Sequence, residues 1–315
     1  MSIEEQTATT VLMIRPVRFE ANRETQASNR FQQRESADAS RTQGHALAEF
    51  HALESALRAA GVAVRVFEDT LEPHTPDSLF PNNWVSFHAD GTVVLYPMLA
   101  PNRRAERRVD ILAQLTARDG FFTSRIVDLT HYEQDGKYLE GTGSLVLDRV
   151  NRVAYACISA RTDLDVLGDF AQQLDYDVVA FEATDSTGYP IYHTNVLMSV
   201  GTRFAAVCAT CIREDARAAV LERLRMSGRA LLELSYDQMH AFAGNMLEVR
   251  SGTGASIVAL SQRAFDSLSA QQRELLAQHT DGIVAVPIPT IEMLGGGSVR
   301  CMLAEVHLPR SRAGV

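Results

Sequence analysis

The sequence contains neither a long apolar run nor a block of basic residues. Residues 1–10 are polar and acidic and precede only a short apolar stretch, so we expect no secretory signal peptide and no membrane span. A net charge of -9 at pH 7 opposes binding to nucleic-acid phosphates, which requires clustered positive charge. We therefore expect a cytoplasmic protein with neither a nucleic-acid nor a membrane partner.

Cysteine is also scarce. Four cysteines in 315 residues are too few for a disulfide framework, and a reducing compartment would keep them as thiols. Cys208 and Cys211 form a Cys-x-x-Cys pair, but a zinc site would need a second pair or suitably spaced histidines. We interpret the pair as the end of an apolar strand, 204–211, that runs into a helix, rather than as a metal or redox site.

The chain has no linker rich in glycine, serine or proline, so we expect a single domain over residues 1–315. Hydrophobic residues make up 46% and charged residues 22%, which excludes a disordered or fibrous protein. Segment 15–41 is polar and lacks periodicity, so it is either a lid over a site or a solvated connection. The sequence leaves the oligomeric state open, a homo-oligomer included.

Short apolar runs rich in valine and isoleucine alternate with stretches whose apolar residues lie three and four apart. The alternation predicts an α/β fold, and closely paired runs favour small mixed sheets over one doubly wound sheet. A repeat of about 60 residues would divide the chain into about five units. We expect strands at 11–14, 62–67, 92–97, 143–148, 153–158, 196–200, 204–208, 246–249, 256–260 and 283–287, and helices at 46–60, 105–118, 163–174, 214–226, 236–243 and 261–277.

Cys301 is the candidate nucleophile. It follows the glycine run 295–297, which lets the backbone fold tightly around the thiol and leaves room for a substrate. The alternative is an inert buried cysteine in a closing strand, 301–306.

Four other segments carry polar residues at the ends of predicted strands. Each alone is a weak signal, but together they supply a carboxylate, an imidazole and amides to accompany a thiol, the parts of a thiol-based catalyst. Strand alternation after Tyr192 would place His193 and Asn195 on the same face. The segments are 80–84 with Asn82 and Asn83, 139–143 with Glu140, 159–162 with Arg161, and 192–196 with His193 and Asn195.

These motifs, in this order, resemble the guanidine-modifying or pentein superfamily, which includes arginine deiminase, dimethylarginine hydrolase, agmatine deiminase and the amidinotransferases. The resemblance runs from Phe80 to Met302. The Phe-Pro-Asn-Asn-Trp and Tyr-His-Thr-Asn-Val segments are most similar to the citrulline-utilization hydrolase branch, which is related to arginine deiminase. The resemblance implies a five-bladed, pseudo-symmetric α/β propeller of ββαβ units.

The resemblance also implies roles for individual residues. Cys301 matches the nucleophile, His193 the catalytic histidine, and Glu140 the carboxylate of a Glu-Gly-Gly segment in which Thr142 replaces the second glycine. No metal or cofactor is implied. Gly244-Asn245 resembles a structural turn, to which we assign no chemistry.

Two positions depart from the superfamily, because Asn83 and Asn195 stand where aspartates are usual. A buried guanidinium needs carboxylates to offset its desolvation, and here Glu140 is the one assured anion near the reacting group. An amide suits a neutral ureido group better, because it offers both a donor and an acceptor. We assign substrate binding to Asn82, Asn83 and Asn195.

Arg161 is expected to bind the substrate's α-carboxylate, because a guanidinium fork pairs with a carboxylate through two hydrogen bonds. The alternative is a surface arginine that pairs within the following helix. We therefore expect a thiol-dependent hydrolase acting on the ureido or guanidino C–N bond of an L-amino acid, most readily citrulline to ornithine through a covalent Cys301 adduct. Alternatives are an arginine or methylarginine deiminase or hydrolase, an amidinotransferase, and a non-catalytic amino-acid-binding propeller.

Overall fold

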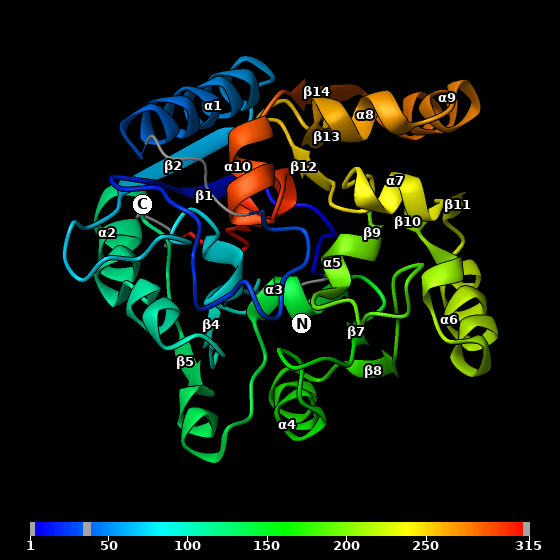
Figure 1. The fold of residues 1–315 in the computed structure, drawn as a ribbon, viewed down its shortest axis with the longest axis horizontal. Helices are drawn as coiled ribbons and strands as arrows, with labels where there is room; N and C mark the ends of the chain where they lie inside the picture. The colour runs from blue at the N-terminus through cyan, green and yellow to red at the C-terminus, as the bar shows by residue number, and fades with distance from the viewer. Residues whose placement is uncertain (1–3, 34–38, 311–315) are drawn as a thin grey trace, which may run out of the picture.

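The computed structural model describes residues 4–33 and 39–310. The described chain forms five three-stranded sheets arranged around a common centre (Figure 1). The sheets are β15 (Ala304–Glu305), β1 (Thr10–Arg15), β2 (Ala63–Glu68); β3 (Val85–Phe87), β4 (Thr92–Leu95), β5 (Arg125–Asp128); β6 (Leu145–Asp148), β7 (Val153–Cys157), β8 (Asp177–Phe181); β9 (Met198–Val200), β10 (Phe204–Val207), β11 (Ala230–Glu233); and β12 (Leu247–Arg250), β13 (Ser256–Ser261), β14 (Gly282–Val286).

Every sheet is built on the same plan. The middle strand pairs antiparallel with one neighbour and parallel with the other, as where β7 pairs with β6 and with β8. Helices on the outside of the molecule connect the two parallel strands (Figure 1). They are α1 (Ala39–Ala59), α2 (Val109–Asp119), α4 (Leu164–Leu174), α6 (Glu214–Met226), and the pair α8 (Gln262–Ser267) and α9 (Ala270–His279). The expected five-bladed propeller of ββαβ units is confirmed.

Helix α4 illustrates how the sequence produces one blade. Asp163 caps its start by accepting a hydrogen bond from the backbone N–H of Asp165, and Asp175 ends it in the left-handed conformation. Its apolar residues recur at helical spacing, and Leu167 and Phe170 are buried against the sheet. Burial of each such side chain contributes about 1.5–3 kcal/mol, so this apolar face fixes the helix on its sheet.

The two ends of the chain share one sheet, because β15 pairs antiparallel with β1, Val11 lying opposite Glu305. This pairing closes the propeller and brings the C-terminal segment to its centre. Short helical turns occupy the same centre (Figure 1). They are η1 (Pro81–Asn83), α3 (Gly141–Ser144), α5 (Thr194–Leu197), α10 (Pro289–Gly295) and η5 (Val299–Met302).

Several expected elements differ in detail from those observed. The strands expected at 143–148 and 196–200 begin instead as the turns α3 and α5, so the alternation argument for His193 and Asn195 was wrong. The helix expected at 261–277 is split in two, because Ser269 forms a capping box that begins a second helix. Helix α1 begins at Ala39, and the helix expected at 236–243 is α7 (Tyr236–His240). The region expected as a helix at 105–118 contains the end of the 3-10 helix η2 (Pro101–Glu106) followed by α2, and the segment 301–306 contains η5 and β15. Strands β3, β5, β8 and β11 were not expected.

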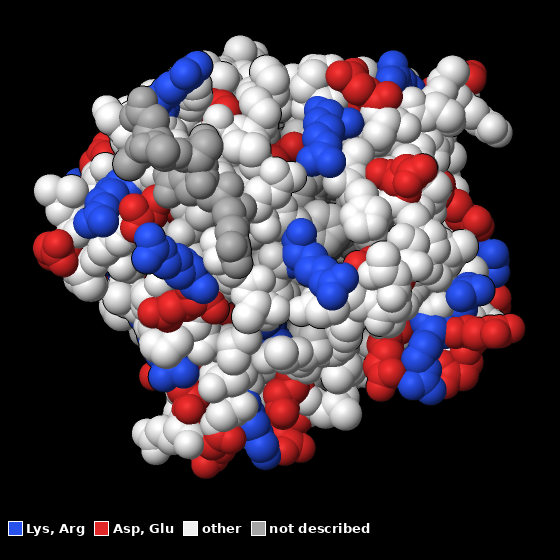
Figure 2. All heavy atoms as spheres, viewed as in Figure 1, with Lys and Arg blue, Asp and Glu red and all other residues white. Residues whose placement is uncertain are grey.

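Acidic and basic side chains are interspersed on the face of the molecule shown in Figure 2, without a large patch of one sign. Such a mixture does not present the continuous positive surface that phosphate backbones require. Within residues 4–33 and 39–310, no helix has both the length and the apolar composition needed to cross a membrane.

The N-terminal segment is fixed by buried polar contacts. The Glu4 carboxylate lies 2.8 Å from Arg149 and 2.7 Å from Arg152, and the Gln6 amide donates to the carbonyls of Leu147 and Val200. Arg149 is 2% exposed. Its charge therefore depends on Glu4, and on Glu305 at 3.9 Å, in place of water.

Loss of the Glu4 carboxylate should destabilise the fold. Glu4→Ala leaves Arg149 buried without its nearest anion, and removal of one partner of a buried ion pair costs about 3–5 kcal/mol. Chemical denaturation measures the free energy of unfolding. The control is Glu5→Ala, whose carboxylate is 60% exposed in its pair with Arg250 and should matter little. Equal stabilities for the two variants would contradict this assignment.

Candidate active site

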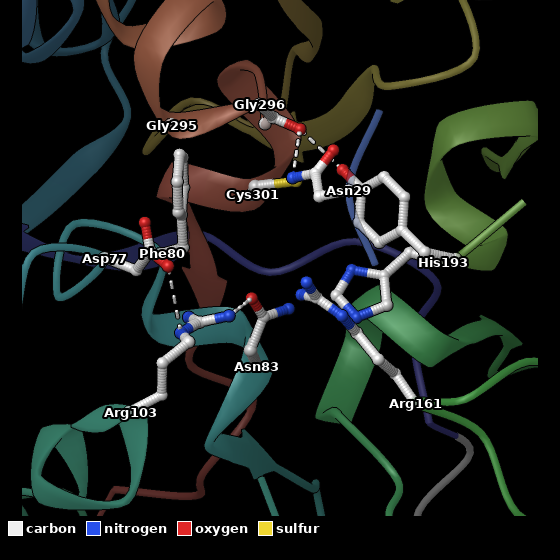
Figure 3. Close-up of a pocket in the computed structure, with 12 residues that line it drawn as sticks. Asn29, Asp77, Phe80, Asn83, Arg103, Arg161, His193, Gly295, Gly296 and Cys301 are labelled. Carbon is white, nitrogen blue, oxygen red and sulfur yellow. Dashed lines mark hydrogen bonds and ion pairs between the residues drawn. The ribbon is translucent and has the colours of Figure 1, made fainter. Parts of the chain in front are cut away.

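Cys301 lies in η5 at the centre of the propeller and is 3% exposed. It lines the cavity shown in Figure 3. The residues around this cavity come from segments far apart in the sequence. They are Asn29, Asp77, Phe80, Asn83, Arg103, Arg161, Tyr192, His193, Gly295, Gly296, Gly297 and Cys301.

The glycine run before Cys301 serves close packing. A Cβ on Gly295 would lie 2.7 Å from the Phe80 ring, and one on Gly296 would lie 2.4 Å from the Asn29 amide nitrogen. Gly296 also has a φ of +64°, a conformation that favours glycine. The glycines therefore let two neighbouring segments approach the thiol, whereas the sequence analysis had them leave space for the substrate.

Two side-chain amides contact the Cys301 sulfur. Asn195 Nδ2 lies 3.5 Å and Asn245 Nδ2 lies 3.3 Å from Sγ. Each amide N–H is placed to donate a hydrogen bond to the sulfur and to hold it in position. Asn195 was expected to bind substrate, but it contacts the nucleophile. Asn245 was not predicted as a site residue, because Gly244-Asn245 was expected to be a structural turn without a chemical role.

Glu140 and His193 form a buried pair. Glu140 Oε2 lies 2.9 Å from His193 Nε2 and 3.2 Å from Arg161 Nη1, and Oε1 accepts the backbone N–H of Leu99. Although burial alone would raise the pKa of Glu140, the Arg161 charge and the hydrogen bond to His193 hold this pKa well below its usual range. Glu140 is therefore an anion, and it accepts a hydrogen bond from the N–H group at His193 Nε2.

The His193 imidazole is neutral in this setting. Burial lowers its pKa to about 4, even though the neighbouring Glu140 carboxylate acts in the opposite direction. Because Nε2 donates to Glu140, Nδ1 carries the free lone pair and can accept a proton. Nδ1 lies close to Gly143, where a Cβ would come within 2.7 Å of it.

Arg161 is buried and is held by the segment that follows β1. Its Nε and Nη2 lie 3.2 Å and 2.7 Å from Ser28 Oγ, and its guanidinium stacks over the Tyr192 ring at 5.0 Å. Thus the edge of the guanidinium fork that suits a carboxylate is occupied by a hydroxyl oxygen. Arg161 is not the surface arginine that the sequence allowed as an alternative.

Asn83 presents only its donor side to the cavity. Arg103 Nη1 donates to Asn83 Oδ1 at 3.0 Å, whereas Asn83 Nδ2 has no partner among residues 4–33 and 39–310. Figure 3 shows the Asn83 nitrogen turned away from Arg103 toward His193 and Arg161. Arg103 itself is fixed by two 2.9 Å hydrogen bonds to Glu106, and no sequence motif had indicated it.

Asp77 also lines the cavity and was missed. Its Oδ2 accepts a 2.8 Å hydrogen bond from Asn22 and lies 3.6 Å from Arg103, while its buried Oδ1 has no partner. Burial raises the pKa of Asp77, with Arg103 opposing the shift. The free oxygen is an acceptor available to a cationic or N–H group of a ligand. Its only sequence signal is its position three residues before Phe80.

Asn82 is the one predicted site residue that lies away from the chemistry. It is buried, its side-chain atoms have no partner, and it does not line the cavity. Its backbone carbonyl accepts the Thr142 hydroxyl at 3.3 Å. This hydrogen bond holds η1 against α3, so the contact made by Asn82 is structural.

Part of segment 15–41 lies over the cavity. Asn29 donates to the Gly296 carbonyl at 3.2 Å, and Tyr189 donates to the Ala27 carbonyl at 2.8 Å. Arg15 belongs to β1 and residues 39–41 belong to α1, so the described covering segment is 16–33. Residues 34–38 of the expected lid lie outside the described chain.

The cavity thus joins a cysteine held by two amides, a neutral histidine oriented by a carboxylate, and paired arginines. Such a set can attack a planar C–N centre, move a proton to the leaving nitrogen and activate water. No group of three or more His, Cys, Asp or Glu residues suited to a metal occurs within 4–33 and 39–310.

His193 should titrate well below 6.5, the ordinary value for histidine. The imidazole is expected to stay neutral down to about pH 4. In the unfolded chain this histidine binds a proton near its ordinary pKa of 6.5, whereas in the folded protein it does so only near pH 4. His193 therefore lowers the free energy of unfolding as the pH falls from about 6.5 to about 4. NMR titration of the imidazole signals, assigned by their loss in His193→Gln, measures the pKa. A midpoint near 6.5 would contradict the buried pairing.

Gly143→Ala should lower turnover without unfolding the protein. Its Cβ would lie 2.4 Å from Asn83 Nδ2 and 2.7 Å from His193 Nδ1, and displacement of catalytic groups by about 1 Å costs about 10²-fold. The control is Gly168→Ala in α4, where no atom lies within 4 Å. That variant should keep full activity and gain up to about 1 kcal/mol of stability. Equal turnover in both would contradict the geometry.

Comparison with known proteins agrees with this site. The sequence profile of the eukaryotic N,N-dimethylarginine dimethylhydrolase family matches residues 15–308. No curated protein sequence matches the chain. Among solved structures, the N-terminal domain of the cyanobacterial arginine dihydrolase ArgZ, in a substrate-bound mutant, is 19% identical with a TM-score of 0.72, over 95% of this chain and 99% of that one.

Two further structures share the fold. Unliganded full-length ArgZ is 20% identical with a TM-score of 0.73, and the match covers 96% of this chain but only 41% of ArgZ. A dimethylarginine dimethylaminohydrolase mutant with an S-methyl-L-thiocitrulline adduct is 14% identical with a TM-score of 0.63, over 94% and 99% of the two chains. Because the family profile spans most of the sequence, the chain belongs to the N,N-dimethylarginine dimethylhydrolase family, within the guanidine-modifying superfamily of hydrolases that act on C–N bonds through a cysteine nucleophile.

Proposed function

We propose that this protein hydrolyses the ureido or guanidino C–N bond of a free L-amino acid, and that citrulline, converted to ornithine, is its preferred substrate. The observation that carries this choice is the orientation of Asn83. Its oxygen is bound to Arg103, so only its N–H₂ group faces the cavity.

A donor at this point suits a carbonyl oxygen and opposes a guanidinium. A guanidinium carries only N–H donors, whereas a ureido group carries one oxygen acceptor. Asn83 Nδ2 lies beside the catalytic imidazole, since a Cβ on Gly143 would contact both groups. The Asn195 side-chain oxygen, next to the sulfur, lacks a partner and is available as an acceptor for a ureido N–H.

The charged residues of the cavity suit the α-amino and α-carboxyl groups of the substrate. Asp77 offers a free carboxylate oxygen for an α-ammonium group. Arg103 and Arg161 line the same cavity and offer guanidinium N–H groups for an α-carboxylate. An amine without a carboxylate would leave these cations less well compensated, which favours an amino acid over agmatine.

In the first step of the proposed reaction, neutral His193 accepts the Cys301 proton. The thiolate attacks the ureido carbon, and the imidazolium, stabilised by Glu140, protonates the departing δ-nitrogen. The C–N bond breaks as the C–S bond forms, releasing ornithine and leaving a carbamoyl thioester on Cys301. Asn195 and Asn245 hold the sulfur in position for this attack.

In the second step, water replaces sulfur. His193, neutral again, accepts a proton from the water that attacks the thioester carbon, and the thiolate leaves. The carbamate so formed breaks down to ammonia and carbon dioxide. Citrulline and one water thus give ornithine, ammonia and carbon dioxide, which balances all atoms.

Segment 16–33 is proposed to act as a lid. Its Ser28 hydroxyl occupies the carboxylate-binding edge of Arg161, so an entering carboxylate can exchange with Ser28 as the segment moves. Closure over the thioester would restrict the solvent near Cys301.

Arginine is the second candidate substrate. The buried carboxylates of Glu140 and Asp77 lie in or beside the cavity and provide negative charge for a guanidinium. The structural neighbour ArgZ is named an arginine dihydrolase. Arginine would first lose ammonia, and a second hydrolysis would follow the citrulline route.

A substrate panel tests the proposal. Citrulline, arginine, the methylarginines and agmatine are each incubated with the protein and scored for ammonia and for the amino-acid product. We expect ornithine from citrulline with the highest kcat/KM, and a carbamoyl adduct on Cys301 in acid-quenched samples. Cys301→Ser should be folded and inactive. Accumulation of citrulline from arginine, with no attack on citrulline, would contradict the preference.

Asn83→Asp tests the orientation argument separately. A carboxylate in place of the amide removes the donor that faces the ureido oxygen and adds an anion for a guanidinium. The ratio of kcat/KM for citrulline to that for arginine should fall by about 10- to 100-fold, the range of one or two charge-assisted hydrogen bonds. An unchanged ratio would show that Asn83 does not face the head group.

A further inference from the structure

Cys208 and Cys211 form a second sulfur cluster, outside the cavity of Cys301. Cys208 follows β10 and Cys211 ends the short helix η4 (Ala209–Cys211). Their sulfur atoms lie 2.8 Å apart, and both residues are free thiols. Both are buried, but Thr210 between them is exposed, so the pair lies directly below the surface. The strand expected at 204–211 ends at Val207, and residues 209–211 form η4. The close sulfur contact is an additional finding.

The two thiols differ in chemical character. The hydrogen bond from the Cys211 thiol lowers the pKa of Cys208, and the same bond, together with burial, raises the pKa of Cys211. Cys208 is therefore the more nucleophilic sulfur, and Cys211 is placed to react with it. Cys157 lacks such a thiol partner among the described residues. Its sulfur donates to backbone carbonyl oxygens, and burial raises the pKa of its thiol to about 12.

Each cysteine of the pair contacts a segment that leads to the catalytic thiol. The Cys208 backbone N–H donates to the Leu197 carbonyl at 2.8 Å. Leu197 ends α5, the turn that carries Asn195. Asn195 in turn donates to the Cys301 sulfur.

The second connection runs through α7. The Cys211 sulfur lies 3.3 Å from the Met239 sulfur. Phe242 donates its backbone N–H to the Met239 carbonyl at 2.9 Å, and Asn245 donates its own to Phe242 at 2.9 Å. Asn245 is the other amide on the Cys301 sulfur. The thiol pair therefore contacts the supports of both donors to the nucleophile.

We propose that Cys208 and Cys211 are a reversible dithiol–disulfide site whose oxidation loosens the two-amide cradle of Cys301. A disulfide requires an S–S bond of about 2.05 Å, so the sulfurs must move together and Cys211 must shift relative to Met239. The movement is transmitted to α5 and to the turn that carries Asn245.

The oxidation balances with hydrogen peroxide as the oxidant. The Cys208 thiolate attacks one peroxide oxygen, the O–O bond breaks, and Cys208 becomes a sulfenic acid with release of water. The Cys211 sulfur then attacks the sulfenic sulfur, forms the S–S bond and releases a second water. Two thiols lose two electrons and two protons, and one peroxide is reduced to two waters. A small thiol reductant reverses the change.

Mass spectrometry tests the disulfide itself. Cys301→Ser removes the competing thiol, and hydrogen peroxide is the oxidant. After denaturation and alkylation with iodoacetamide, trypsin releases peptide 204–213, which contains both cysteines and no other. We expect this peptide to resist alkylation until it is reduced, while peptide 153–161, with Cys157, is alkylated throughout. Full alkylation of peptide 204–213 after peroxide treatment would overturn the proposal.

The effect on Cys301 is measured without any substrate, so failure of the proposed function and failure of this inference are distinguishable. In the native wild-type protein, iodoacetamide should alkylate the remaining Cys301 thiol about three- to tenfold more slowly after oxidation of the pair, the range expected when one or two donors weaken. Cys211→Ala, or Cys211→Ser if the first variant does not fold, should lose this response. A disulfide that leaves the alkylation rate unchanged would overturn the coupling.

Discussion

The buried carboxylate of Glu140 is the contact on which the arrangement of the site depends. It is fully buried, accepts the backbone N–H of Leu99, and has three cationic or N–H side-chain neighbours in His193, Arg161 and Arg103. An unpaired anion at this depth would cost several kcal/mol, so the three partners and the carboxylate fix one another. The imidazole tautomer follows, because an anionic acceptor at Nε2 leaves Nδ1 as the base. The proposed chemistry therefore rests on an electrostatic arrangement that exists before substrate binds.

The propeller supplies the site by repetition. In every blade a short turn or loop precedes the strand nearest the centre, and each of these segments contributes a polar group to the site. Asn83 precedes β3, Glu140 precedes β6, Asn195 precedes β9, Asn245 precedes β12 and Cys301 precedes β15. Five equivalent positions around one axis thus converge on one cavity, although the chain separates them widely. The pairing of β15 with β1 returns the segment that carries Cys301 to the centre of the propeller.

Periodicity predicted most of the buried strands and amphipathic helices, although it missed the short buried strand β3. The motifs predicted catalytic roles for Cys301, His193 and Glu140 and substrate binding for Asn83 and Arg161, and the structure brings these residues together at one site. The strands β5 and β8 were not predicted, because they lie at sheet edges with exposed residues and lack a clear apolar pattern. Asp77, Arg103 and Asn245 were not predicted as site residues, because their roles depend on long-range contacts that local sequence spacing does not reveal. The apolar pattern predicts strand at the turns α3 and α5, because four residues are too few to show a helical period.

The charge of the cavity bears on the proposed preference for a neutral head group. Arg103 pairs with Glu106 and Asp77, and Arg161 pairs with Glu140, so both arginines have carboxylate partners before substrate enters. A guanidinium would have to share carboxylates that are already paired, and it would lie next to Arg161 and the donor face of Asn83. A zwitterionic amino acid with a ureido side chain adds no net charge, and its carboxylate and ammonium groups meet partners of opposite sign. The proposed selectivity therefore depends on which charges are already paired, more than on how many there are.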